Sequence, residues 1–207
     1  MPRKPSAGEG FLNGFIIDSK PLMERMEWDM YDKVDQHLIN RQLSLKAGLN
    51  HYPAGWLNAT CAFYYIAVSG PKRAKVEQVV ENMMAPDEIA EIVESLSDVH
   101  RQALATVVNA GGWVKYSVVS KQVGDETPDS YFWESSPPTS VIGQLRLRGL
   151  IFVGRVVEGN RRYKAIVVPK ELRASLTRVL PEPNNFRAVK KAQRASDDGA
   201  PNAGGKF

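Results

Sequence analysis

Two runs rich in β-branched residues occupy residues 150–157 and 162–168, with Gly159 and Asn160 between them. Glycine readily adopts the positive φ that a tight hairpin turn requires, so this pattern predicts a two-stranded β-hairpin. A hairpin alone is at best marginally stable in water and has to pack against other elements. The segments on either side of it therefore decide the fold.

The flanking segments carry helix signals. Thr139 or Ser140 is the expected N-cap of a helix over 141–148, which Gly149 ends. Farther upstream, the sequence predicts a strand over 113–116, a brief helix capped by Ser117 that runs to Val123, and a polar loop over 126–138. Downstream, Pro169 opens a last helix over 170–180.

The resulting order is helix, short strand, helix, helix, hairpin, helix, and it resembles the winged helix-turn-helix superfamily. The resemblance is most specific over 141–150 and covers about 85 of the 207 residues. The stretch 95–176 also resembles the winged-helix region found N-terminally in bacterial and archaeal XPB-type helicases, through Leu96-Ser97 and the phrase 168–172, Val-Pro-Lys-Glu-Leu. The resemblance implies a fold in which the hairpin is the wing and 141–148 is the recognition helix.

The first half of the chain has a helical pattern from Asp29 to about Val108, with Pro and Gly residues between its apolar stripes. The fold class is therefore mainly α with a small β-hairpin, a helical bundle followed by a winged helix-turn-helix domain. The predicted organisation is an N-terminal tail over 1–20, a helical region over 21–96, the winged domain over 97–181 and a basic tail over 182–207.

Charge is distributed unevenly along the chain. The net charge is only +4, but residues 76–100 contain seven Asp and Glu and no Lys or Arg, while residues 139–178 contain nine Lys and Arg and two Glu. Such asymmetry favours a polyanionic partner for the basic segment. The alternative is that the acidic and basic segments complement each other within one fold.

Together with the basic segment, the resemblance implies duplex DNA as the partner and a transcriptional regulator or accessory factor as the function. Residues near the start of the recognition helix, Thr139, Ser140 and Gln144, would lie closest to base edges, and Gly143 would permit close backbone approach. Phosphate or guanine contacts are expected from basic side chains of that helix, Arg146 and Arg148. Backbone or minor-groove contacts are expected from the wing residues Arg155, Arg161, Arg162 and Lys164.

The rival function is a non-catalytic protein-docking module that uses the aromatic loop 131–133, Tyr-Phe-Trp, as an interface anchor. A homodimer is a further possibility, with Met30, Val34 and Leu38 on its surface. The two functions differ in whether the basic wing, Gln144 and Arg148 form one uncovered face.

Enzyme classes find no support in the sequence. Cys61 is the only cysteine, and the three histidines lack metal-ligand spacing, so no metal, cofactor or catalytic residue is predicted. No apolar run approaches the ~20 residues that span a bilayer. We expect a cytoplasmic protein, associated with the nucleoid if it is bacterial or archaeal.

Overall fold

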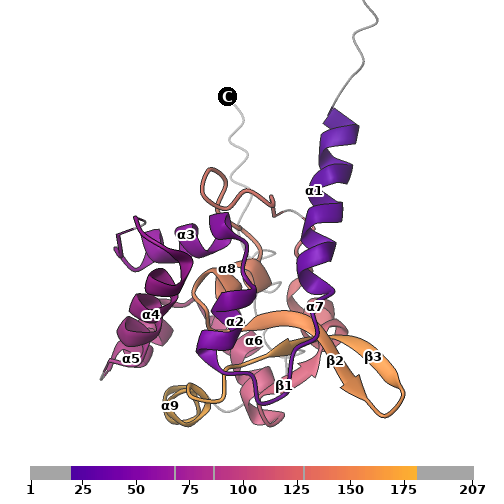
Figure 1. Ribbon diagram of the computed structural model, residues 1–207. Helices are drawn as coiled ribbons and strands as arrows, with labels where there is room; N and C mark the ends of the chain where they lie inside the picture. The colour runs from indigo at the N-terminus through magenta and orange to yellow at the C-terminus, as the bar shows by residue number, and fades with distance from the viewer. Residues whose placement is uncertain (1–19, 68, 86, 128, 181–207) are drawn as a thin grey trace, which may run out of the picture.

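The computed structural model describes residues 20–67, 69–85, 87–127 and 129–180 (Figure 1). This part of the chain is mainly helical and contains a three-stranded antiparallel sheet. The predicted tails, 1–20 and 182–207, lie outside the described residues except for Lys20, where the first helix begins.

Helices make up the first part of the chain, with the bounds α1 Lys20–Asp35, α2 Leu45–His51, α3 Ala54–Phe63, α4 Lys72–Met83 and α5 Glu88–Ser95. Pro53 and Pro71 occupy the N-cap positions of α3 and α4, as expected from their fixed φ. Helix α3 is shorter than the apolar run of sequence that begins at Trp56. It ends at Phe63, because Tyr65 adopts a left-handed φ of 55°.

The second part contains the bounds α6 Asp98–Asn109, β1 Trp113–Lys115, α7 Tyr116–Val123, α8 Val141–Leu147, β2 Phe152–Glu158, β3 Arg161–Val167 and α9 Arg173–Val179. Ser140 is confirmed as the N-cap of α8. The N-cap predicted at Ser117 is wrong, since Lys115 holds that position for α7. The last helix begins at Arg173 rather than at Lys170.

The sheet has the strand order β1-β3-β2. Glu158 pairs with Arg161 across the two-residue turn Gly159-Asn160, which confirms the predicted hairpin, and Gly159 has a φ of 58°. The free edge of β2 is covered by the chain just after α1. The N–H of Ile39 donates to the carbonyl of Arg155, and the N–H of Arg155 donates to the carbonyl of His37.

One hydrophobic core joins both parts of the chain. Trp56 of α3 stacks on Trp133 of the α7–α8 loop with ring centroids 3.9 Å apart and an interplanar angle of 3°. Tyr31 of α1 packs against the same Trp56 ring at 4.9 Å. The predicted boundary near residue 96 therefore runs through a continuous core, and the α7–α8 loop is part of that core.

Candidate nucleic-acid interface

The connected ends of β2 and β3 project away from the helices (Figure 1). All six residues from Val157 to Arg162 are exposed, and a Cβ added at Gly159 would meet no atom within 4 Å. Nothing in the described part of the chain therefore covers this end of the hairpin. It is open to a partner.

The tip of the hairpin carries two exposed arginines on opposite faces. Arg161 and Arg162 are consecutive in β3, and successive side chains of a strand point to opposite sides of the sheet. Glu158 lies directly across from Arg161, but its carboxylate pairs with Arg41 at 3.0 Å. Among the described residues neither Arg161 nor Arg162 has an acidic partner within ion-pair distance.

Two other predicted wing residues are held by the body of the protein. The guanidinium Nε of Arg155 donates to the side-chain oxygen of Gln36 at 3.2 Å, and Arg155 is half-buried. Lys164 pairs with Asp35 at 2.6 Å, and its Nζ lies over the Tyr116 ring, 4.1 Å from the ring centroid. Arg155 and Lys164 therefore fix the base of the hairpin.

One further cation, which was not predicted from the sequence, lies beside the hairpin. Lys115 of β1 is exposed, and its Nζ lies 4.0 Å from the centroid of the Tyr163 ring. The pairing of Lys115 with Ala165 places it on the same face of the sheet as Tyr163 and Arg161. A short strand was predicted over 113–116 and is observed over Trp113–Lys115, but its pairing with β3 has no signal in the local sequence.

Helix α8, the predicted recognition helix, has no exposed residue between Val141 and Leu147. Helices α3, α6 and α7 pack against it. The hydroxyl of Tyr52 donates to the carbonyl of Arg146 and that of Tyr64 to the carbonyl of Arg148, both at 2.7 Å. Elements far apart in sequence thus cover both the sides and the C-terminal end of this helix.

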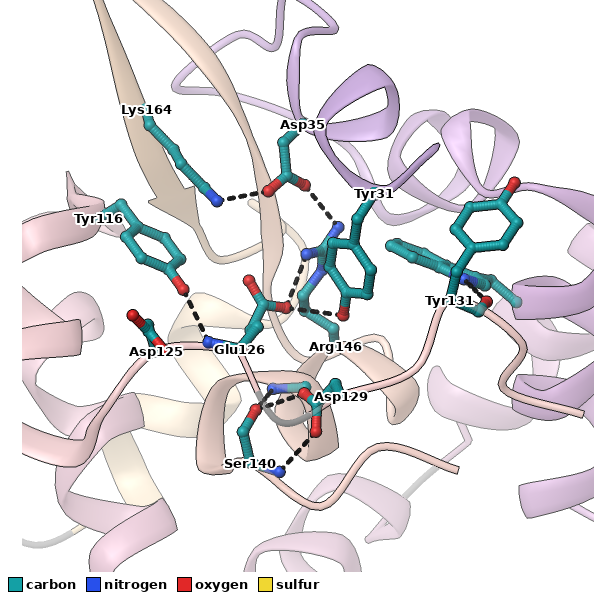
Figure 2. Close-up of polar contacts among 12 residues, drawn as sticks. Tyr31, Asp35, Tyr116, Asp125, Glu126, Asp129, Tyr131, Ser140, Arg146 and Lys164 are labelled. Atoms are coloured by element: carbon teal, nitrogen blue, oxygen red, sulfur yellow. Dashed lines mark hydrogen bonds and ion pairs between the residues drawn. The ribbon is translucent and has the colours of Figure 1, made fainter. Parts of the chain in front are cut away.

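The N-terminus of α8 is closed by Asp129 (Figure 2). Its Oδ1 accepts the backbone N–H groups of Thr139 at 2.7 Å and Ser140 at 2.8 Å, and its Oδ2 accepts the Ser140 hydroxyl. The Ser140 Oγ in turn accepts the N–H of Gly143 at 2.9 Å. A carboxylate here offsets the positive end of the helix. Thr139 is exposed, but the Ser140 side chain is already used as a cap.

Gly143 was expected to permit close approach of DNA. A Cβ at this position would instead collide with the carboxylate of Asp129 and with Pro138. Glycine is required here because the α7–α8 loop lies directly against the helix. The expectation is therefore wrong, because the α7–α8 loop, and not DNA, lies against Gly143.

Arg146 was predicted to contact phosphate or guanine, and the structure contradicts this. Its side chain is fully buried and lies between two carboxylates (Figure 2). Its Nη1 donates to Glu126 at 2.7 Å and its Nη2 donates to Asp35 at 3.0 Å. The guanidinium also lies 4.6 Å from the centroid of the Trp56 ring. Arg146 is a core residue that joins α1, the α7–α8 loop and α8.

Burial and neighbouring charges shift the pKa values of the groups in this cluster. Burial opposes the charge on Arg146, but Glu126 and Asp35 hold its pKa well above the usual value. Burial raises the pKa of the Glu126 carboxyl in spite of the opposing charge of Arg146. Tyr31 donates its hydroxyl to the same Glu126 oxygen at 3.2 Å, and burial raises the pKa of that hydroxyl. Arg146 and Lys164 are thus paired with the two buried carboxylates, Asp35 and Glu126, inside the protein.

The two remaining helix residues are half-buried. The side-chain amide of Gln144 donates to the carbonyl of Thr139 at 3.3 Å. The guanidinium of Arg148 donates to the carbonyl of Gln144 at 3.0 Å and lies 4.8 Å from the centroid of the Phe63 ring. Burial lowers the pKa of Arg148. Gln144 and Arg148 do not form one uncovered face with the hairpin tip.

The residues proposed for protein contacts are also partly enclosed. Trp133 is 0% exposed, whereas Phe132 of the same loop is 47% exposed. Val34 is buried in the core, and α1 ends at Asp35, before Leu38. The predicted dimer stripe over Met30, Val34 and Leu38 is therefore not a continuous helical surface.

Within the described ranges, no group of three or more His, Cys, Asp or Glu side chains is arranged to bind a metal ion. The helices in these ranges also lack the combined length and apolarity needed to cross a membrane. Comparison of the chain with protein-family models, curated proteins and solved structures finds no match.

Proposed function

We propose that this chain binds duplex DNA through phosphate contacts made by the β2–β3 hairpin. The observation that carries the proposal is the pair of exposed arginines at a projecting hairpin tip, Arg161 and Arg162, with no acidic partner among the described residues. Exposed arginines suit phosphate oxygens because the guanidinium donates two parallel hydrogen bonds. The element order from α6 to α9 supports a winged-helix fold with this hairpin as the wing.

The proposal differs from the usual winged-helix arrangement in the part played by α8. Because α8 has no exposed residue, it contributes structure and the hairpin contributes the contacts. Arg161 and Arg162 point to opposite faces of the ribbon. They are therefore suited to phosphates on both sides of a groove rather than to a single strand lying against one face. Contacts of this kind bind DNA with little dependence on base sequence.

The test is fluorescence anisotropy with a random-sequence duplex, titrated at several salt concentrations. The variant Arg161→Ala/Arg162→Ala should lower the slope of log affinity against log salt by about 2, since each phosphate contact contributes about 0.9. At 0.1 M salt this corresponds to a loss of roughly tenfold to hundredfold in affinity.

The matched control is Lys170→Ala/Arg178→Ala, which removes two exposed positive charges on and before α9. Its slope should equal that of the wild type. Absence of salt-dependent binding by the wild-type protein, or equal slopes for the two double variants, contradicts the proposal.

A second candidate is the docking module, and one observation favours it. Three aromatic side chains of the described residues are exposed outside the hairpin: Tyr65 at 98%, Phe132 at 47% and Trp28 at 45%. Exposed aromatic rings commonly anchor protein interfaces. Failure to bind any duplex at low salt would make this the better proposal, and Tyr65→Ala would then be the first variant to compare in protein-binding experiments.

A further inference from the structure

The two faces of the β2–β3 hairpin differ in the cations that they expose. Arg162 is exposed on one face, but the next residue of β3 on that face, Lys164, points toward Asp35 and pairs with it (Figure 2). The other face begins with the exposed Arg161 and gains a second exposed cation, Lys115, from the neighbouring strand β1. Within the three strands, two exposed cations therefore lie on the Arg161 face and one on the opposite face.

The ring of Tyr163 brings the Lys115 ammonium close to the tip. Lys115 pairs with Ala165, which is four residues from Arg161 or about 13 Å along the strand. Its Nζ, however, lies 4.0 Å from the centroid of the Tyr163 ring, within the range of a cation–π contact. Tyr163 is only two residues, or about 7 Å, from Arg161. Among the described residues, Lys115 has no carboxylate within ion-pair distance.

This arrangement suits the phosphates of one DNA strand. Each strand of a duplex presents a phosphate about every 3.4 Å along the axis, so two cations about 7 Å apart span about two nucleotide steps. A lysine loses rotamer freedom when it is held at a phosphate, and an ammonium that a ring already positions loses less. Glu158 also lies on this face, but Arg41 pairs with it at 3.0 Å, so the face keeps a net positive charge.

We propose that Lys115 is a third phosphate-binding residue of this surface and that Tyr163 is its positioning residue. The inference rests on the proposed function and adds the orientation of the duplex. The DNA strand that contacts the Arg161 face lies on the side of β1, which is an edge strand of the sheet. Tyr163 acts through Lys115 rather than by stacking on a base, because the bases of a duplex are already stacked on one another.

The experiment is fluorescence anisotropy with a random-sequence duplex at several salt concentrations. Lys115→Ala should lower the slope of log affinity against log salt by about 0.9, roughly a three- to tenfold loss of affinity at 0.1 M salt. Lys115→Arg keeps a cation over the ring and should restore the wild-type slope. The matched control is Lys170→Ala, at an exposed lysine beyond the opposite end of β3, and its slope should equal that of the wild type.

A double-mutant cycle tests the part played by Tyr163. Tyr163→Leu keeps an apolar side chain at this half-buried position but removes the ring, so affinity should fall about two- to fivefold. Tyr163→Phe keeps the ring and should bind like the wild type. In the Lys115→Ala background, Tyr163→Leu should cause no further loss. An equal loss in both backgrounds would show that Tyr163 contacts DNA itself, which overturns its positioning role.

Failure of this inference differs from failure of the proposed function. A wild-type protein without salt-dependent duplex binding overturns both. If Arg161→Ala/Arg162→Ala lowers the slope while Lys115→Ala and Lys170→Ala have equal slopes, duplex binding by the hairpin tip stands and the assignment of Lys115 is overturned.

Discussion

The hairpin and α8 are both basic in sequence, but the arginines of the hairpin tip are exposed whereas Arg146 of α8 is buried. Arg146 of α8 is enclosed by two carboxylates and three aromatic rings. Arg161 and Arg162 of the hairpin remain exposed, and the carboxylate across from Arg161, that of Glu158, is paired with Arg41. A basic segment of sequence can therefore contain both cations that are paired with carboxylates inside the protein and cations that remain exposed and can bind a partner.

The acidic partners that make this division come from distant parts of the chain. Asp35 lies at the end of α1 and Glu126 lies in the α7–α8 loop, 111 and 20 residues from Arg146. Lys164 shares Asp35, so one side chain of the hairpin belongs to the buried cluster. The boundary between the structural and the available cations thus falls within β3, between Arg162 and Lys164.

The largest expected effect concerns Arg146. Replacing it as Arg146→Met leaves Glu126 buried without its cation and leaves Asp35 paired only with the half-buried Lys164, so the free energy of unfolding should fall by about 3–5 kcal/mol. Urea denaturation measures this, with Arg161→Met as the matched control, for which a change within about 0.5 kcal/mol is expected. Comparable stability of the two variants would break the contrast between the two arginine sites.

A smaller effect is expected at the start of α8. Ser140→Ala removes the side chain that caps the N–H of Gly143 and bonds Asp129. The free energy of unfolding should fall by about 1 kcal/mol, the usual cost of losing an N-cap. Duplex affinity, measured where both proteins are fully folded, should remain at the wild-type value. A loss of affinity without a loss of stability would show that Ser140 serves DNA rather than the helix.

The smallest effect concerns His100, which lies on α6 beside α8. Burial, followed by the nearby charge of Arg148, lowers the pKa of His100 below its usual 6.5. The unfolded chain therefore binds this proton more readily than the folded protein. The associated stability is present above pH 6.5 and is lost as the pH falls toward the folded-state pKa.

Denaturation curves at several pH values between 7 and 5 test this, with His100→Asn as the variant. The wild-type free energy of unfolding should decrease over this interval by less than the one-proton limit of about 1.4 kcal/mol per pH unit. The variant should show a shallower decrease. His51, whose pKa burial also lowers, remains in the variant and keeps part of the slope. Parallel curves for the two proteins would contradict the assignment to His100.

The helix and strand pattern was largely predictable because its signals are local. Pro53, Pro71 and the N-cap Ser140 mark helix starts, and Gly159-Asn160 marks the hairpin turn. The exceptions depend on tertiary contacts. Tyr65 leaves the helical conformation although its neighbours are apolar, and the pairing of residues 37–39 with β2 joins segments more than 100 residues apart. Local sequence carries no information about such pairs.

The candidate site was predictable only in part. The exposure of Arg161 and Arg162 follows from their place beside a tight turn. The burial of Arg146 had one sequence signal, since Arg146 lies four residues after Ile142 and therefore on the same face of the helix. Arginine is rarely buried without a paired carboxylate, so the residue type favoured an exposed side chain. Its acidic partners and the covering helix α3 could not be found from spacing along the chain.

The most direct test of the contrast is to map backbone amide chemical shifts of the ¹⁵N-labelled protein as a short duplex is added. The account predicts that amides from Glu158 to Tyr163 shift with added DNA in a salt-dependent way, while amides from Val141 to Leu147 stay in place. Shifts concentrated in Val141–Leu147, with the hairpin amides unchanged, would contradict it and would indicate that α8 is the DNA-binding surface.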